Sequence, residues 1–336
     1  MRDYFRPIPE TDAAPAPWAC TLAGGWCHFS KVEVLSRGAL PRIVDVRDLP
    51  HETLQPLTRP RAPIAGMSLS APRIMGILNV TPDSFSDGGQ HLGRGAVAHA
   101  RVMAETGADI LDIGGESTRP GATAVPTEIE IARTAPVIKD IRLATDTLVS
   151  IDTRKAPVAR AALAAGAGLI NDVAGFTYDA SLADVAAAAG VPVCVMHAQG
   201  DPATMQDKPE YDDVLLDVYD FLQARVTALI AAGVAADHII VDPGIGFGKT
   251  LDHNLALLKR MSLFHALGCP ILLGASRKRF IGRLTGVETA DQRLVGSLAV
   301  AQAGWGQGVQ IVRVHDVLET RQALEMWSAL TGTADT

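Results

Sequence analysis

Polar side chains follow eight short apolar segments between residues 74 and 315, at the point where each segment ends. Three of them, Asp152, Asn171 and Asp242, offer carboxylate or amide oxygens. A carboxylate that is shielded from water needs hydrogen-bond donors from its partner. These three residues therefore suit a flat heterocycle that carries amino and ring N–H groups. Taken singly, Asp152 or Asp242 would more often cap a following helix, so the argument depends on their convergence.

Neighbouring residues could complete a site for such a ring. Met196 and Phe247 offer apolar faces, and Lys278 can donate to a carbonyl or ring nitrogen. His197, which follows Met196, is expected to be a packed core histidine instead. Together, these residues would contact both faces of a heterocycle and the polar atoms at its edge.

A second group of residues suits an anion. Arg313 and His315 are two positions apart on an expected strand, so their side chains point to the same side. Asn79 ends the first expected strand, and a helix that starts near Ser276 adds free backbone N–H groups for a carboxylate. Together with the first group, these residues predict one pocket for a heterocycle, a phosphate group and an aromatic acid.

The segment 74–89, IMGILNVTPDSFSDGG, joins an apolar strand to a polar loop. A short apolar run bounded by turn residues is typical of a strand covered on both faces. Loops at the C-terminal ends of such strands commonly carry the chemistry of α/β proteins. By itself, the loop could equally be a long solvated turn.

Strands and helices alternate from residue 74 to residue 330, which predicts a parallel sheet with right-handed crossovers. The expected strands are 74–80, 108–114, 148–152, 169–173, 191–197, 238–242, 270–275 and 310–315. The expected helices are 95–106, 127–142, 155–165, 180–189, 212–232, 252–265, 277–282, 290–305 and 317–330. Eight units of this total length favour an α/β fold of the (β/α)8 TIM-barrel class. An open doubly wound sheet is the alternative, but the first turn lacks its glycine-rich sequence.

Residues 1–72 lack this alternation and are expected to form a small N-terminal extension, with the barrel domain at 73–336. Trp18–Leu22 and Cys27–Val34 could pair as a β-hairpin that turns at Gly24 and Gly25. Arg59–Pro72, which contains three prolines, reads as a linker. We expect this extension to be a structural appendage.

Charge and composition exclude some classes of function. The chain has 336 residues, a net charge of −7 and a pI near 5.7, which argues against general affinity for nucleic acid or anionic membranes. The opening segment has no signal-peptide pattern, and no apolar run is long enough to span a membrane. Four cysteines without zinc or redox spacing fit a reducing cytoplasm.

The segments ILNVTPDSFSDGG, DIGGESTRPGA, SIDTRK, INDVAGF, VMH, DPGIGFGK, GASRKRFIG and RVHDV resemble the dihydropteroate synthase family, in the right order over residues 74–330. This resemblance implies a (β/α)8 barrel, a homodimer, and a Mg2+-dependent reaction. That reaction joins p-aminobenzoate to 6-hydroxymethyl-7,8-dihydropterin diphosphate and releases diphosphate. It is understood to be dissociative, with diphosphate leaving before the amine attacks.

The resemblance also assigns roles to single residues. It places the pterin against Asp152, Asn171, Asp242 and Lys278, with Met196 and Phe247 flanking the ring, and the diphosphate against Thr118, Arg313 and His315. It places Mg2+ at Asn79 and the p-aminobenzoate pocket at Phe85, Thr118, Pro120 and Arg279. It implies direct catalytic roles for Asp87, Arg119 and Lys278.

One departure from the family pattern lies in the p-aminobenzoate pocket. Arg279 stands where many members have serine, so sulfonamide affinity need not be typical. A methyltetrahydrofolate:corrinoid methyltransferase shares the carboxylate–amide logic of ring binding, but does not need the two polar loops or the Arg313/His315 pair. A non-catalytic pterin-binding homologue would be expected to lose Asn79, Arg119, Arg313 or Lys278, all of which are present.

Overall fold

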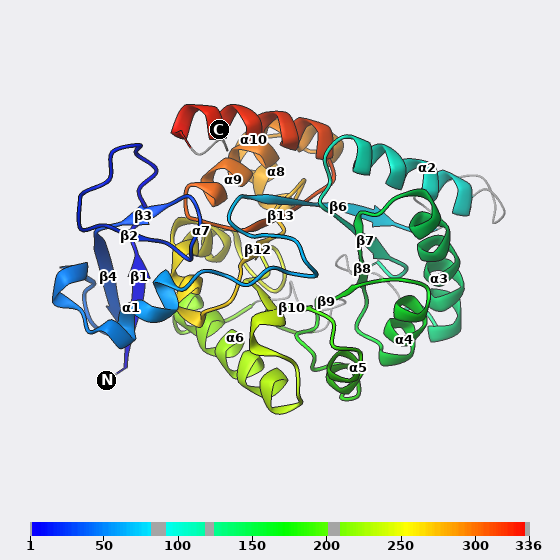
Figure 1. Cartoon of the computed structure of the whole chain (residues 1–336), viewed down its shortest axis with the longest axis horizontal. Coiled ribbons are helices and arrows are strands. Elements are labelled where there is room, and N and C mark those ends of the chain that lie inside the picture. The colour runs from blue at the N-terminus through cyan, green and yellow to red at the C-terminus, as the bar shows by residue number, and fades with distance from the viewer. Residues whose placement is uncertain (1, 82–91, 118–123, 201–208, 333–336) are drawn as a thin grey trace.

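The computed structural model describes residues 2–81, 92–117, 124–200 and 209–332, and its centre is an eight-stranded parallel barrel (Figure 1). The strands are β6 (Arg73–Asn79), β7 (Ile110–Gly114), β8 (Leu148–Asp152), β9 (Leu169–Asp172), β10 (Val193–Met196), β11 (Ile239–Asp242), β12 (Leu272–Leu273) and β13 (Ile311–Val314). They pair in the order β11-β10-β9-β8-β7-β6-β13-β12, and a parallel bridge between Val241 and Ile271 joins the two ends. The expected (β/α)8 architecture is confirmed.

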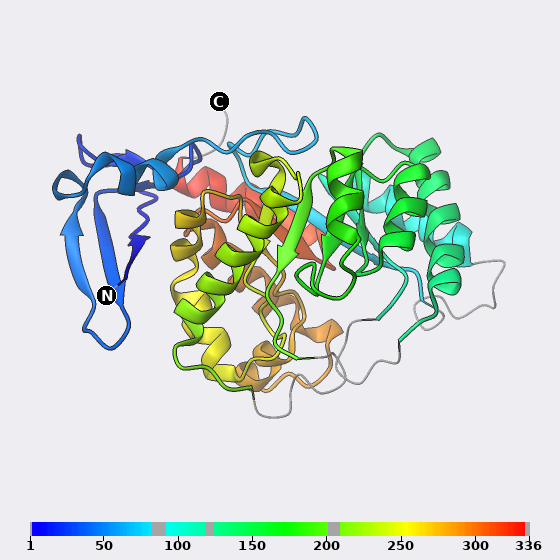
Figure 2. The same cartoon turned by 90° about the horizontal axis from the view of Figure 1, so that it is seen from below.

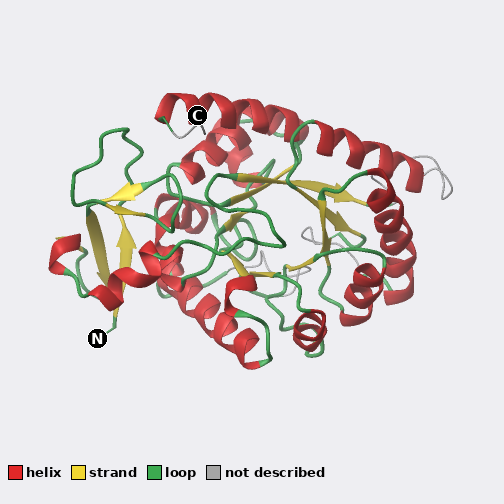
Figure 3. Ribbon diagram, in the orientation of Figure 1, coloured by secondary structure: helices red, strands yellow, loops and turns green. Residues whose placement is uncertain are grey.

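At least one helix follows each barrel strand, and these helices surround the barrel (Figure 3). They are α2 (Leu92–Glu105), α3 (Thr127–Ala144), α4 (Ala156–Ala164), α5 (Leu182–Ala189), α6 (Val214–Ala231), α7 (Leu251–Lys259), α8 (Arg279–Thr285), α9 (Leu294–Trp305) and α10 (Val317–Thr331). Among the described helices, none has the length and hydrophobicity that crossing a membrane requires.

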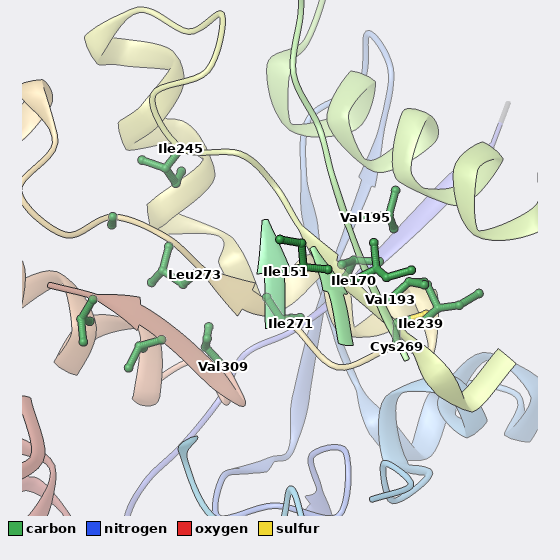
Figure 4. Packing of buried hydrophobic residues seen from close by; sticks show 14 of the residues in the cluster. Ile151, Ile170, Val193, Val195, Ile239, Ile245, Cys269, Ile271, Leu273 and Val309 are labelled. Carbon is green, nitrogen blue, oxygen red and sulfur yellow. The ribbon is translucent and has the colours of Figure 1, made fainter. Parts of the chain in front are cut away.

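Side chains alternate along each strand between the helices and the barrel interior. Residues such as Ile151, Ile170 and Val193 pack under the helices in one large apolar cluster (Figure 4). Residues one position away form a separate cluster, which we call the floor. It contains Ile64, Leu69, Met75, Ile110, Leu169, Cys194, Ile240, Leu272 and Ile311. Ile64 and Leu69 come from the segment before β6, so that segment closes the barrel at the end where the strands begin.

Residues 2–58 pack beside the barrel (Figure 2). An antiparallel sheet joins β1 (Asp3–Pro7), β4 (Lys31–Ser36) and β5 (Arg42–Asp45), and β2 (Cys20–Thr21) pairs with β3 (His28–Phe29). A short 3-10 helix, η1 (Val46–Asp48), and helix α1 (His51–Thr58) follow. The pair β2 and β3 lies within the two stretches expected to form a hairpin.

The helix expected at 252–265 is wrong in its second half. The α-helix α7 ends at Lys259, and a 3-10 helix, η4 (Met261–Leu267), replaces its expected second half. Two further 3-10 helices, η3 (Ala236–His238) and η5 (Asp291–Arg293), precede β11 and α9. The break has a tertiary cause. Ser262 Oγ donates to the Pro7 carbonyl at 2.8 Å, and Arg260 Nε contacts Glu33 Oε2 at 3.1 Å, so η4 adapts to the N-terminal sheet.

Candidate functional site

The alternation that builds the floor also builds a polar layer above it. Two residues beyond each floor residue that lies on a barrel strand, the side chain again points into the barrel. The residues at these positions include Asp112, Asn171, Met196, Asp242, Gly274 and Arg313, and Ser150 pairs with Asp112 at the same level. We call this layer and the strand ends just beyond it the mouth. A barrel interior that changes from apolar to charged within two residues has its ligand-binding face there.

Arg313 connects the carboxylates on two strands of the mouth. Its Nε donates to Asp112 Oδ2 at 2.6 Å, and its Nη2 donates to Asp152 Oδ2 at 2.8 Å. Asn171 Nδ2 donates to the same Asp112 oxygen at 3.0 Å. Among the described residues, Arg313 Nη1 has no hydrogen-bond partner, so it remains available to an anion.

Asp112 was missed in the sequence and is the most deeply buried residue of this network, with no exposed surface. Its Oδ1 has no hydrogen-bond partner among the residues that the structure describes. A buried carboxylate oxygen without a donor is costly, so a ligand N–H is the expected compensation. The signal in the sequence was its spacing, since Asp112 stands two positions after floor residue Ile110 in an otherwise apolar strand.

Asp242 ends β11, and Lys278 follows β12, the strand that pairs with the one carrying Arg313. Asp242 Oδ1 accepts from the Gly244 backbone N–H at 2.7 Å, which fixes the carboxylate. Lys278 Nζ donates to the Ile245 carbonyl and lies 4.5 Å from the centroid of the Phe247 ring. A Cβ on Gly274 would lie 3.6 Å from Asp242 Oδ2 and 4.0 Å from Lys278 Nζ. Gly274 thus lies beside both charged groups.

The burial of these groups shifts their protonation. Burial raises the pKa of Asp242, although Lys278 opposes the shift. Burial also raises the pKa of Asp152, and here Arg313 opposes the shift while Asp112 adds to it. Burial lowers the pKa of Lys278 to about 8 against the attraction of Asp242. Desolvated acceptors beside a lysine whose pKa is lowered by burial are typical of a ligand-binding or catalytic site.

Lys249 holds together the residues that follow β10 and β11. Its buried Nζ lies 2.8 Å from His197 Nδ1 and donates to the carbonyls of Gly244 and Phe247 at 2.9 and 3.0 Å. Burial, followed by the charge of Lys249, lowers the pKa of His197 to about 2. The expectation that His197 is a packed core histidine therefore agrees with its surroundings. A Cβ on Gly244, whose φ is +69°, would lie 1.9 Å from the His197 carbonyl oxygen, so this turn requires glycine.

The part of the mouth predicted to bind an anion contains His315 and Asn79. His315 Nδ1 and Ser276 Oγ lie 3.1 Å apart, and the His315 backbone N–H donates to the same hydroxyl at 3.2 Å. Asn79 pairs with Gly114 across β6 and β7. Its Oδ1 lies 3.3 Å from the place that a Cβ on Gly114 would occupy, beside Asp152.

The remaining predicted residues fall into two groups. Phe85, Asp87, Thr118, Arg119 and Pro120 lie outside the described residues. Arg279 is the first residue of α8 and its side chain is exposed, while Lys278 is the residue that precedes that helix. Arg277, two residues before α8, pairs with Asp316, with its Nε 2.9 Å from Asp316 Oδ2.

Comparison with known proteins gives consistent matches. Residues 75–315 match the family described as Pterin binding enzyme. The chain is 47% identical over 264 residues to the dihydropteroate synthase of Escherichia coli K12, covering 78% of this chain and 93% of that protein. It is 45% identical over 261 residues to the dihydropteroate synthase of Bacillus subtilis, covering 76% of this chain and 88% of that one.

Solved structures agree. The Xanthomonas albilineans dihydropteroate synthase with 4-aminobenzoic acid matches with a TM-score of 0.77 and 48% identity, over 82% of this chain and 99% of that one. The same enzyme in complex with 7,8-dihydropteroate matches with a TM-score of 0.74 and 44% identity, over 82% of this chain and all of that one. Each match leaves roughly a fifth of this chain outside it.

Proposed function

This chain belongs to the dihydropteroate synthase family, and we infer that it joins p-aminobenzoate to 6-hydroxymethyl-7,8-dihydropterin diphosphate. The products are 7,8-dihydropteroate and diphosphate, so the enzyme is a transferase of folate biosynthesis. The carbon–oxygen bond between the pterin methylene and diphosphate breaks with its electron pair on oxygen. A carbon–nitrogen bond to the amine then forms, and the amine nitrogen loses one proton.

The observation that carries this proposal is the excess of buried acceptors in the mouth. Asp112, Asp152 and Asp242 are less than a tenth exposed, and Asp112 Oδ1 lacks a donor within the described part of the chain. A pterin edge carries the amino and ring N–H groups that would satisfy them. Lys278 would donate to the ring's acceptor atoms, and Met196 and Phe247 would cover its faces.

The same residues suit a dissociative route. Loss of diphosphate leaves positive charge on the pterin methylene and its ring, and buried carboxylates such as Asp152 and Asp242 favour that charge. Arg313 Nη1 and His315 would bind the departing diphosphate. Asp87, Arg119 and the p-aminobenzoate residues Phe85, Thr118, Pro120 and Arg279 remain predictions.

Mg2+ is proposed at the diphosphate end. No cluster of three His, Cys, Asp or Glu side chains that could hold a metal occurs among the described residues. Mg2+ does not need one, because it is commonly bound by one or two protein oxygens together with substrate phosphates and water. The Asn79 amide oxygen at the end of β6, beside Gly114, fits this pattern. Bound there, the ion would neutralise charge on the leaving diphosphate.

We further propose a cytoplasmic homodimer with two small-molecule substrates and no nucleic-acid or membrane partner. The four cysteines are free, which suits a reducing compartment. Leu284 on α8 and Val295 on α9 are 55% and 79% exposed, so neighbouring helices offer apolar surface to a second copy. Sedimentation velocity of the full chain tests the dimer, and a monomer at all concentrations would contradict it.

The decisive experiment measures diphosphate release by the purified protein with Mg2+. We expect release only when both p-aminobenzoate and the pterin diphosphate are present, with 7,8-dihydropteroate formed in equal amount. Methyl transfer from methyltetrahydrofolate to a corrinoid, without diphosphate release, would instead support the methyltransferase alternative. Tight pterin binding without either reaction would identify a non-catalytic homologue.

A further inference from the structure

A buried ionic cluster lies at the base of the segment that leaves β7, outside the network of the mouth. We define the Glu116 clamp as Glu116, Val125, Glu130 and Lys155. We propose that Glu116 and Lys155 are positioning residues, which hold Glu116 and Val125 on either side of segment 117–124 in fixed positions relative to the mouth. This inference rests on the proposed function, because the resemblance places the p-aminobenzoate residues Thr118 and Pro120 in that segment.

Both backbone polar groups of Val125 are bound by side chains. The Val125 N–H donates to Glu116 Oε1 at 2.8 Å. The Val125 carbonyl accepts from Lys155 Nζ at 2.6 Å. Lys155 Nζ also lies 3.2 Å from Glu116 Oε2, which closes the arrangement. The residue where the segment ends is therefore tied to the residue that precedes it, and to the end of β8.

The clamp is itself held rigidly. Lys155 Nζ contacts Glu130 Oε2 at 2.7 Å, and Thr153 Oγ1 donates to Glu130 Oε1 at 2.7 Å. Glu130 belongs to α3 and has no exposed surface. A Cβ on Gly115 would lie 2.7 Å from Thr134 of α3, so the chain passes too close to that helix to shift toward it.

Charge and hydrogen bonding keep the Glu116 carboxylate ionised in this site. Burial works to raise its pKa, but the Val125 N–H, Arg154 and Lys155 together lower the pKa below its usual range. Arg154 Nε lies 3.3 Å from Glu116 Oε2, and the Arg154 guanidinium lies 4.1 Å from the Tyr178 ring centroid. Two cations and one backbone N–H therefore hold the Glu116 carboxylate in one position.

The clamp also has a fixed relation to the pterin residues. Lys155 stands three positions after Asp152, whose carboxylate contacts Arg313 at 2.8 Å. The same strand end thus positions a proposed pterin ligand and the lysine that binds the end of segment 117–124. A displaced segment should weaken the second substrate and leave the first substrate's site intact.

The test compares two buried carboxylates that each pair with two cations. Glu116→Ala removes the acceptor of the Val125 N–H, while Lys155 keeps Glu130 as a partner. Glu33→Ala is the matched control, because Glu33 is 5% exposed, pairs with Arg6 and Arg260, and lies at the N-terminal sheet. For Glu116→Ala we expect the KM for p-aminobenzoate to rise at least about tenfold, as for other displaced binding groups. The Kd of the pterin diphosphate, measured by calorimetry, should change by less than about twofold.

Glu33→Ala should lower the melting temperature without changing either substrate constant. Glu116→Gln retains an acceptor for Val125 and should recover part of the p-aminobenzoate KM. Equal weakening of both substrates in Glu116→Ala, or an unchanged KM for p-aminobenzoate, would overturn the clamp. An inactive wild-type protein would instead overturn the proposed function, so the two failures are distinguishable.

Discussion

The two ends of the barrel differ in how their carboxylates are paired. Where the strands begin, Asp109 contacts two arginines, whereas at the mouth one arginine contacts two carboxylates. Asp109 accepts from Arg73 Nη1 at 3.1 Å, from Arg321 Nη2 at 2.8 Å and from the Ile74 backbone N–H at 2.8 Å. Arg313 is shared between Asp112 and Asp152, and one oxygen of Asp112 lacks a partner within the described chain.

The difference shows which end of the barrel is complete without a ligand. At the end where the strands begin, two arginines donate to the single carboxylate of Asp109. The neighbouring floor residues are apolar and buried. At the mouth, Asp112 is more deeply buried than Asp109, and its Oδ1 has no donor among the described residues. An uncompensated buried acceptor destabilises the free protein, so its persistence indicates that a bound molecule supplies the missing donors.

Removing residues 1–58 should produce the largest change in stability. The deletion strips Trp26 from the Trp305 carbonyl, which it contacts at 2.8 Å, and exposes the residues that pack against Leu22 and Phe29. Each large buried side chain that is lost accounts for about 1.5–3 kcal/mol. The chemistry should remain, because we propose that residues 73–336 contain the whole active site. Thermal unfolding and turnover of the folded fraction test this, and lost turnover in a folded protein would place the N-terminal residues at the site.

Ile240→Ala should damage the floor but spare the mouth. Ile240 is fully buried in the floor, two residues before Asp242 on β11. Leaving a cavity there should lower the free energy of unfolding by about 2–5 kcal/mol, and Ile240→Val by about 0.5–1.5 kcal/mol. Denaturant titration measures both losses. A collapse of pterin affinity in Ile240→Val, where the cavity is small, would contradict the separation of floor and mouth.

Asp242→Asn should have the opposite effect to a floor substitution. The asparagine oxygen can still accept from the Gly244 N–H, so the fold should be retained. Loss of the charge should weaken binding of the pterin diphosphate by about 1.5–3 kcal/mol, the usual contribution of a hydrogen bond to a charged group. Calorimetry gives the affinity. Asp109→Asn is the control, and it should lower stability and leave pterin binding unchanged. Unchanged affinity in Asp242→Asn would contradict the assignment of Asp242 to the pterin.

The strand ends could be predicted from the sequence because each of these site residues comes at the end of a short apolar run, and the end of the run marks the end of the strand. Asp152, Asn171 and Asp242 were found in this way, and the structure places them in one mouth. Asp112 was missed because it lies inside an apolar strand, where only the register decides which side chains point inward.

Other elements depend on contacts that a local pattern does not contain. Strand β1 pairs with β4 across some thirty residues, as in the pair of Asp3 with Ser36. The change from α7 to η4 follows from the contact of Ser262 with Pro7, more than 200 residues away. Ile64 and Leu69 lie in a proline-rich stretch that reads as a linker, yet both are buried in the floor.

The smallest expected effect is a shift in the pH dependence of the mouth. Burial lowers the pKa of Lys278 to about 8, so its ammonium is lost as the pH rises through that value. The lysine is fully charged at lower pH, where it attracts Asp242 and can donate to the ring. We therefore expect kcat/KM for the pterin diphosphate to fall above about pH 8. Lys278→Arg keeps its charge at any accessible pH, because a guanidinium does not titrate in this range.

The arginine variant should be less active at neutral pH, since its fork cannot reproduce the position of Nζ over Phe247 and against the Ile245 carbonyl. Its profile should nevertheless lose the alkaline decline. Rate measurements under subsaturating pterin diphosphate on both proteins test this. The same alkaline decline in both proteins would assign the titration to a group other than Lys278. The unpaired Asp112 oxygen would then be the remaining difference between the mouth and the end of the barrel at Asp109.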